Sequence, residues 1–261
     1  MSLGKGKYIF PNLFTSLNFL LGVWAIIMAT NSVVESANSL FYAGNFIVYC
    51  VLFDKLDGFA AKRLNASSEF GAQFDSLADL IGFGLAPAML MLFTYSQKAP
   101  EWFAANKLIV FIAMSLYVLC AAMRLARYNA VDVNEGDGSF FVGLPSTLAG
   151  AINAILILIY LKYDLFAHGG HIALIPILVL FATAIGMVSP LTVPKLMSRQ
   201  NKFINWFQLI NIVLCYLFGI LMILPEFQAV LIGIYVVIGG GYSNLIAKDW
   251  RSVIGTDKPA V

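Results

Sequence analysis

The sequence is dominated by apolar stretches, each about 20 residues long, the length that a helix needs to cross the hydrocarbon core of a bilayer. Eight of them follow one another along the chain, at about residues 12–31, 39–63, 69–95, 102–127, 142–162, 171–189, 204–223 and 227–247. A chain in lipid must satisfy its backbone hydrogen bonds internally, and apolar segments of this length do so as helices. We therefore predict an all-α fold: a polytopic membrane helical bundle of about eight transmembrane helices, forming a single domain over residues 1–261.

The composition agrees with a membrane protein and argues against a nucleic-acid partner. Hydrophobic residues make up 60% of the chain and charged residues 11%, proportions typical of integral membrane proteins. The formal net charge is only +2, and the basic residues are spread over the ends of the apolar stretches instead of forming a run. We therefore expect membrane lipids around the protein and no nucleic acid.

The basic residues are distributed unevenly between the two ends of the predicted spans. With the amino terminus in the cytoplasm, twelve of the 16 Lys and Arg residues fall at cytoplasmic ends. Only Lys98, Lys107 and Lys162 fall at outer ends, and Lys55 lies within the second span. Because positive residues are retained on the cytoplasmic side, both termini are predicted to be cytoplasmic. We expect the protein in the cell (inner) membrane.

Four aspartates lie within the second and third apolar stretches, where an uncompensated charge costs several kcal/mol. At helical spacing, Asp54 and Asp57 share one helix face, while Asp75 and Asp79 share another. The two faces meet if the helices are antiparallel. Four anionic groups in one pocket repel one another unless a hard divalent cation, such as Mg2+ or Mn2+, lies between them. The sequence therefore predicts a metal-dependent phosphoryl-transfer site at the cytoplasmic ends of these helices.

Other polar residues fall near the same cytoplasmic ends. Asn12, Thr15 and either Ser16 or Asn18 recur at helical spacing in the first span. They either line the pocket of the aspartates or serve as helix caps and interhelical hydrogen bonds. Arg124 and Arg127 share a face at the end of the fourth span, and either bind an anionic headgroup or anchor the helix end at the interface. Ser146, after a Gly and Pro turn, either touches a ligand or caps the fifth span. The residues alone leave these alternatives open.

The acidic segment fits the pattern D-x-x-D-G-x-x-A-R, eight residues, G-x-x-x-D-x-x-x-D. The matching positions are Asp54, Asp57, Gly58, Ala61, Lys62, Gly71, Asp75 and Asp79. On this motif the chain resembles the CDP-alcohol phosphotransferase family. Lys62 stands where the family has Arg, so a positive charge is kept while the bidentate fork of Arg is lost.

Further stretches resemble one branch of this family, the integral-membrane phosphatidylserine synthases of bacteria and archaea. They are PNLFT at 11–15, FD at 53–54, FGAQFDSLAD at 70–79, FG and P at 83–87, RLARYN at 124–129 and GLP at 143–145. The resemblance implies transfer of the phosphatidyl group of CDP-diacylglycerol to the hydroxyl of L-serine, with release of CMP. Alternatives are other family members with glycerol phosphate, inositol phosphate or choline as acceptor. A cation transporter, in which intramembrane aspartates bind ions, is a remote alternative.

The resemblance also implies roles for the acidic residues. The expected metal ligands are Asp54, Asp57, Asp75 and Asp79, which would hold two divalent ions, Mg2+ or Mn2+, against the pyrophosphate. Asp79 would also be the catalytic base that takes the proton of the serine hydroxyl. The active site would then lie at the cytoplasmic interface, where the nucleotide enters from water while the lipid tails stay in the bilayer.

The resemblance implies two further groups of binding residues. The nucleotide and CDP-lipid site would consist of Asn12, Thr15, Gly58, Ala61, Lys62 and Gly71. Arg124 and Arg127 would bind the serine carboxylate or a lipid phosphate. Dimers are common in the family, so a homodimer is also expected.

Overall fold

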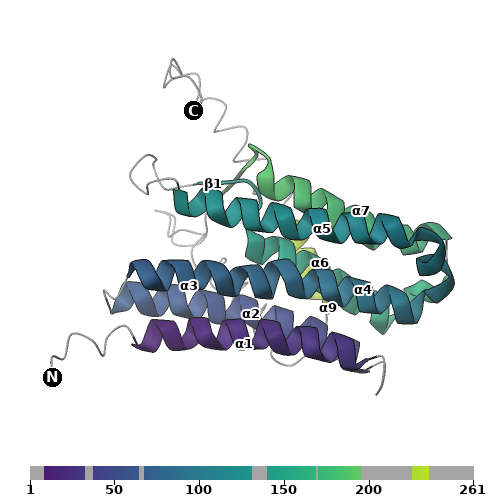
Figure 1. The fold of residues 1–261 in the computed structure, drawn as a ribbon, viewed down its shortest axis with the longest axis horizontal. Helices are drawn as coiled ribbons and strands as arrows, with labels where there is room; N and C mark the ends of the chain where they lie inside the picture. Colours follow the sequence, from purple (N-terminus) through teal and green to yellow (C-terminus); the bar gives the residue numbers. More distant parts are fainter. Residues whose placement is uncertain are drawn as a thin grey trace, which may run out of the picture.

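Helices make up almost all of the structure (Figure 1), a computed structural model that describes residues 9–32, 38–64, 68–130, 140–168, 170–194 and 225–234. Its helices are α1 (Ile9–Asn31), α2 (Asn38–Arg63), α3 (Glu69–Asp79), η2 (Leu80–Leu85), α4 (Ala86–Lys98), α5 (Pro100–Ala130), α6 (Ser146–Lys162), η3 (Leu165–His168), α7 (Gly170–Val188) and α9 (Pro225–Ile234). Two short strands, β1 (Phe140–Val142) and β2 (Thr192–Pro194), form an antiparallel ribbon that the sequence analysis did not predict. The all-α fold class is confirmed.

Five helical segments of the described chain are long and apolar enough to cross a membrane. They are Asn12–Asn31, Asn38–Gly58, Glu69–Lys98, Pro100–Ala130 and Gly170–Val188. The fifth predicted span corresponds to the shorter apolar helix α6. The span predicted at 204–223 lies outside the described residues, as does 235–247 of the last one. The count of eight, the cytoplasmic termini, the single domain and the homodimer stay predictions.

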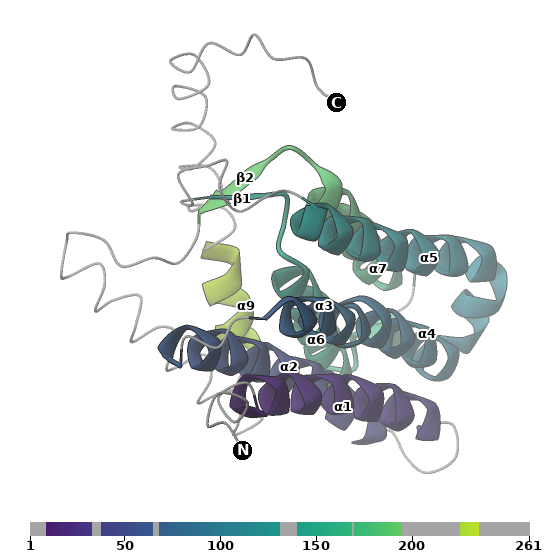
Figure 2. The ribbon, with the colours of Figure 1, turned by 60° about the vertical axis from the view of Figure 1, so that its left-hand side comes forward.

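The helices run side by side as a bundle, with α3, η2 and α4 forming one continuous rod between α1 and α5 (Figure 1). α1 packs along α2, α5 packs along α7, and α6 lies against α2, α7 and α9. Figure 2 shows the resulting tiers, with α1 and α2 on one side, α3, α4 and α6 in the middle, and α5 and α7 on the other. The carboxyl end of α2 and the amino end of α3 therefore lie at the same end of the bundle.

Many small residues lie in the contacts between these helices, and the outer face of α5 carries large apolar residues. The alanines that are at most 1% exposed are Ala25, Ala29, Ala43, Ala78, Ala86, Ala88, Ala113, Ala121, Ala149, Ala154 and Ala173. The outer face of α5 instead carries Leu108, Ile109, Phe111, Ile112, Leu116, Leu119 and Met123, all at least 40% exposed. Small residues let helix backbones approach closely in lipid, and large apolar groups on the outside are solvated by acyl chains. The arrangement fits a protein that spans a membrane.

A π-helical turn, η2, follows directly after Asp79 and joins α3 to α4. In an α-helix the carbonyl of Phe83 would accept from the backbone N–H of residue 87, but Pro87 has none. The hydroxyl of Tyr117 on α5 donates to that carbonyl instead, at 2.8 Å. Both Phe83 and Tyr117 are fully buried. Tyr117 therefore satisfies a backbone group that the local sequence leaves unpaired.

Candidate functional site

Three of the predicted metal ligands converge between α2 and α3. One carboxylate oxygen from each of Asp54, Asp57 and Asp75 lies within 4.8 Å of the other two. Asp57 is only 6% exposed, and the Oδ1 atom of Asp75 is buried without a hydrogen-bond partner in the described part of the chain. Carboxylate oxygens are the ligands that Mg2+ and Mn2+ prefer, and a bound cation would satisfy the unpaired Oδ1 atom. The donor set fits a hard divalent cation.

Helix α1 contributes a hydrogen-bond donor to one of the clustered aspartates. The hydroxyl of Thr15, 3% exposed, donates to Oδ2 of Asp57 at 3.0 Å. Such a bond fixes the orientation of a carboxylate and leaves its other oxygen for a cation. Thr15 therefore lies beside the aspartates through an interhelical hydrogen bond, and a role in ligand binding stays a prediction.

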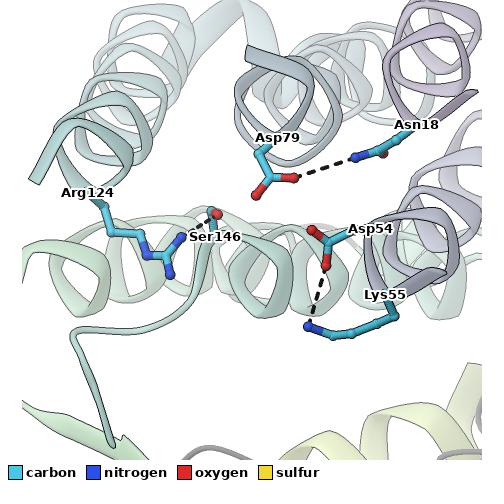
Figure 3. A network of polar contacts seen from close by, with 6 residues as sticks. All are labelled: Asn18, Asp54, Lys55, Asp79, Arg124 and Ser146. Atoms are coloured by element: carbon cyan, nitrogen blue, oxygen red, sulfur yellow. Dashed lines mark hydrogen bonds and ion pairs between the residues drawn. The ribbon is translucent and has the colours of Figure 1, made fainter. Parts of the chain in front are cut away.

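Asp79 is buried, at 7% exposed, one helical turn beyond Asp75, and is not among the three clustered carboxylates. Its Oδ1 atom lies 3.5 Å from Nδ2 of Asn18, a fully buried residue of α1 (Figure 3). The amide therefore holds one oxygen of Asp79 and leaves the other toward the interior of the site. This geometry suits a carboxylate that exchanges a proton with a substrate.

A lysine flanks the cluster on α2. Nζ of Lys55 lies 3.4 Å from a carboxylate oxygen of Asp54, and its side chain is 56% exposed. An exposed ion pair of this kind contributes little to stability. It offsets part of the negative charge of the cluster.

Two glycines and an asparagine mark the side of the site formed by α1, α2 and α3. A β-carbon on Gly71 would lie 3.3 Å from Oδ1 of Asn12, so α1 and α3 meet closely there. Gly58 is exposed, and a β-carbon on it would meet no atom of the described residues within 4 Å. Of the predicted nucleotide residues, Gly58 therefore leaves open space, whereas Gly71 and Asn12 form a close contact between α1 and α3. The side chains of Ala61 and Lys62 lie outside the described residues.

Arg124 reaches the site from the opposite side, on α5. Its Nη1 atom donates to Oγ of Ser146 at 2.7 Å, and the two residues are 9% and 0% exposed. Figure 3 shows the side chains of Arg124, Asp79 and Asp54 extending toward a common space in front of α6. Asp79 lies between Arg124 and Asp54 in this arrangement. The positively charged guanidinium of Arg124 thus faces the acidic cluster, with Asp79 between them.

Arg127, one turn later on α5, has different partners. Its guanidinium donates to the carbonyls of Met187 at 3.2 Å and Val188 at 3.3 Å, at the end of α7, and to that of Val142 at 3.0 Å. Gly143 lies against this fork with φ +79°, and a β-carbon there would be 2.3 Å from the Met187 carbonyl oxygen. In the structure, Arg127 therefore holds the end of α7 by hydrogen bonds and has different partners from Arg124.

Three further residues lie at the site, and the sequence did not fix their partners. Asn18 follows Thr15 at helical spacing, which is a signal for a shared face, but the pattern does not show that Asp79 is its partner. Ser146 was left between ligand contact and helix capping, and its hydroxyl instead accepts from Arg124. The pairing of Lys55 with Asp54 has no sequence signal beyond adjacency.

Comparisons with known proteins show the family to which the chain is similar. A family model described as CDP-alcohol phosphatidyltransferase matches residues 8–189. A Helicobacter pylori (strain ATCC 700392 / 26695) protein named CDP-diacylglycerol--serine O-phosphatidyltransferase is 30% identical over 233 residues, which cover 89% of this chain and 90% of the relative. Proteins of the same name from Methanocaldococcus jannaschii and Bacillus subtilis (strain 168) are 32% identical over 138 residues and 31% over 150. These alignments cover 53% and 58% of this chain, and 54% and 76% of the relatives.

Proposed function

The chain belongs to the CDP-alcohol phosphatidyltransferase family, and from this premise we propose that it acts as a CDP-diacylglycerol–serine O-phosphatidyltransferase of phospholipid biosynthesis. It transfers the phosphatidyl group to the hydroxyl of L-serine, giving phosphatidylserine and CMP. The observation that carries this proposal is the convergence of Asp54, Asp57 and Asp75 in an apolar bundle, next to the buried Asp79. We further propose that the site lies at the cytoplasmic interface of the cell (inner) membrane.

Asp54, Asp57 and Asp75 would hold the divalent cation, with Asp79 as the predicted fourth ligand of a two-ion site. Bound Mg2+ or Mn2+ would stabilise the negative charge that develops on the phosphate oxygens and on the departing CMP. Thr15 keeps Asp57 oriented for this purpose through its 3.0 Å hydrogen bond.

Asp79 is proposed as the base. The serine oxygen forms a bond to the phosphorus of the phosphatidyl group, and the bond from that phosphorus to the oxygen of CMP breaks. The hydroxyl proton of serine passes to the carboxylate of Asp79, since a hydroxyl is a weak nucleophile until its proton is removed. Asn18 holds the other oxygen of Asp79, which keeps the accepting atom aimed at the site.

The two sides of the site suit the two substrates. The open space at Gly58 and the close pair of Gly71 and Asn12 lie on the side of α1, α2 and α3, where we place the cytidine nucleotide with Thr15, Ala61 and Lys62. Arg124 lies beyond Asp79 on the side of α5 and α6, where an acceptor would present its hydroxyl to the base.

An acceptor panel tests the proposed function. The purified protein in detergent, with CDP-diacylglycerol and Mn2+ or Mg2+, is expected to release CMP with L-serine and to form phosphatidylserine. Glycerol 3-phosphate, inositol phosphate and choline should give background rates. Asp75→Asn and Asp79→Asn should each lower turnover with serine by at least about 100-fold. Preferred turnover of another alcohol would refute serine as the acceptor, and full turnover by either variant would refute the assigned roles.

A further inference from the structure

Arg124 is a buried cation that faces Asp79 but forms no direct ion pair with any carboxylate of the described residues. The ion pairs found among the described residues are Lys55 with Asp54 and Lys162 with Glu226, so no carboxylate of that part of the chain pairs with Arg124. Its side chain is nevertheless only 9% exposed. Buried charges in proteins are normally paired, because an unpaired charge loses its hydration without compensation. The unpaired guanidinium indicates that an anionic ligand completes this part of the site.

Two neighbours fix the position of the guanidinium. Nη1 donates to Oγ of Ser146 at 2.7 Å, and the group lies over the ring of Tyr128, 5.8 Å from its centroid. A guanidinium carries five N–H donors, so the bond to Ser146 leaves most of them for a ligand. Ser146 is fully buried at the first turn of α6, which makes its oxygen a rigid anchor. The Ser146 hydroxyl is not hydrogen-bonded to Arg127, whose guanidinium donates to carbonyl groups of β1 and α7.

From this geometry we propose that Ser146 is a positioning residue that sets the selectivity for an acceptor with a carboxylate, by holding Arg124 at the acceptor side of Asp79. The inference rests on the proposed function and refines it. Figure 3 shows the guanidinium of Arg124 and the carboxylate of Asp79 extending toward the same space. An amino acid whose hydroxyl meets Asp79 from the side of α5 and α6 would bring its own carboxylate toward Arg124. A carboxylate accepts two parallel hydrogen bonds from a guanidinium fork, provided that the fork is held in one orientation.

The experiment compares L-serine with L-serinamide, an analogue of nearly the same shape that has a neutral amide in place of the carboxylate. Steady-state rates of CMP release give KM and kcat for each acceptor and for CDP-diacylglycerol, and an analogue that is not turned over is measured as a competitive inhibitor. The wild-type protein should prefer L-serine by at least about 100-fold, since the site's buried donors stay unpaired with the amide.

Ser146→Ala should raise KM for L-serine about tenfold and leave both KM for CDP-diacylglycerol and the constants for serinamide within about twofold. Thr147→Ala, which removes the neighbouring hydroxyl of the same helical turn, is the matched control and should keep wild-type selectivity. Arg124→Lys keeps the positive charge but removes the guanidinium that Ser146 holds in place. It should lower the preference for L-serine over serinamide at least as much as Ser146→Ala does.

The outcomes separate the two proposals. If the wild-type protein does not use L-serine, the proposed acceptor is wrong. If it uses L-serine but does not distinguish it from serinamide, the proposed function stands and the carboxylate selectivity assigned to Ser146 and Arg124 is wrong. If the wild-type protein distinguishes them but Ser146→Ala keeps the full preference, the positioning role is wrong. Equal losses with both acceptors and with CDP-diacylglycerol would show a structural role only. If Ser146→Ala does not fold, wild-type selectivity in Arg124→Lys would overturn the inference, and a lowered preference would support it. If the variants raise KM for CDP-diacylglycerol and leave KM for L-serine unchanged, Arg124 binds a lipid phosphate instead, which would also overturn the inference.

Discussion

Gly22 on α1 and Gly82 in η2 lie backbone against backbone. A β-carbon on Gly22 would be 2.9 Å from the Cα atom of Gly82 and 3.0 Å from its nitrogen. One turn before these glycines stand Asn18 and Asp79, whose side chains meet across the same helix pair. The close approach of the two backbones therefore sets the spacing at which α1 supports the proposed base.

Gly22→Ala is expected to push α1 away from η2 and to lower CMP release about 10- to 100-fold, although it removes no polar atom, because small displacements of a positioned group are costly in catalysis. Gly233→Ala on α9 is the control, since a β-carbon there would meet no atom within 4 Å in the part of the chain that the structure describes. Rates of CMP release at saturating substrate would measure the effect. Wild-type activity in Gly22→Ala would show that the helix spacing is not critical.

Thr15→Val should weaken the response to metal. The variant keeps the shape of the side chain but loses the hydroxyl that donates to Asp57 at 3.0 Å. Loss of a residue that orients a metal ligand typically costs 10- to 100-fold in affinity, so the Mn2+ concentration for half-maximal CMP release should rise by about tenfold or more. Ser16→Ala is the matched control, because the Ser16 hydroxyl donates to the Asn12 carbonyl of its own helix. An unchanged Mn2+ dependence in Thr15→Val would argue against this role.

The two arginines of α5 should differ in their mutant phenotypes. Arg127→Met removes donors to the carbonyls of Met187, Val188 and Val142, and should lower the free energy of unfolding by about 1–3 kcal/mol. Arg124→Met should chiefly raise KM for serine. Thermal unfolding and acceptor kinetics of both variants check this division. A larger rise in the serine KM for Arg127→Met than for Arg124→Met would contradict this division and indicate that Arg127 binds the acceptor.

Tyr117→Phe should destabilise the protein by about 1–3 kcal/mol, because the carbonyl of Phe83 would lose its donor in the protein interior. Unfolding in detergent measures the change. Tyr42→Phe is the control, since Tyr42 is 46% exposed. Equal stability of the two variants would mean that another group satisfies the carbonyl.

Much of the bundle follows from the length of the apolar stretches. The stretches predicted at 12–31 and 171–189 correspond to the segments Asn12–Asn31 and Gly170–Val188. The meeting of Asp54, Asp57 and Asp75 was also predictable, because helical spacing assigns them to two faces and a short connection makes the helices antiparallel. These features depend on local periodicity, which a single sequence carries.

The features that the sequence did not predict depend on partners from distant segments. The π-turn after Asp79 combines Pro87 with a hydroxyl from Tyr117 on another helix. Arg124 and Arg127 have the same local signal, and only the positions of α6 and α7 separate their roles. The ribbon of β1 and β2 joins segments that flank α6 and α7.

Binding of Mn2+ to the purified protein tests the central claim most directly, because free and bound Mn2+ differ in their electron paramagnetic resonance signal. The wild-type protein is predicted to bind Mn2+ saturably, and Asp75→Asn, which replaces one oxygen donor of the cluster without changing its size, should bind at least about tenfold more weakly. The same Mn2+ affinity in both proteins would contradict the account.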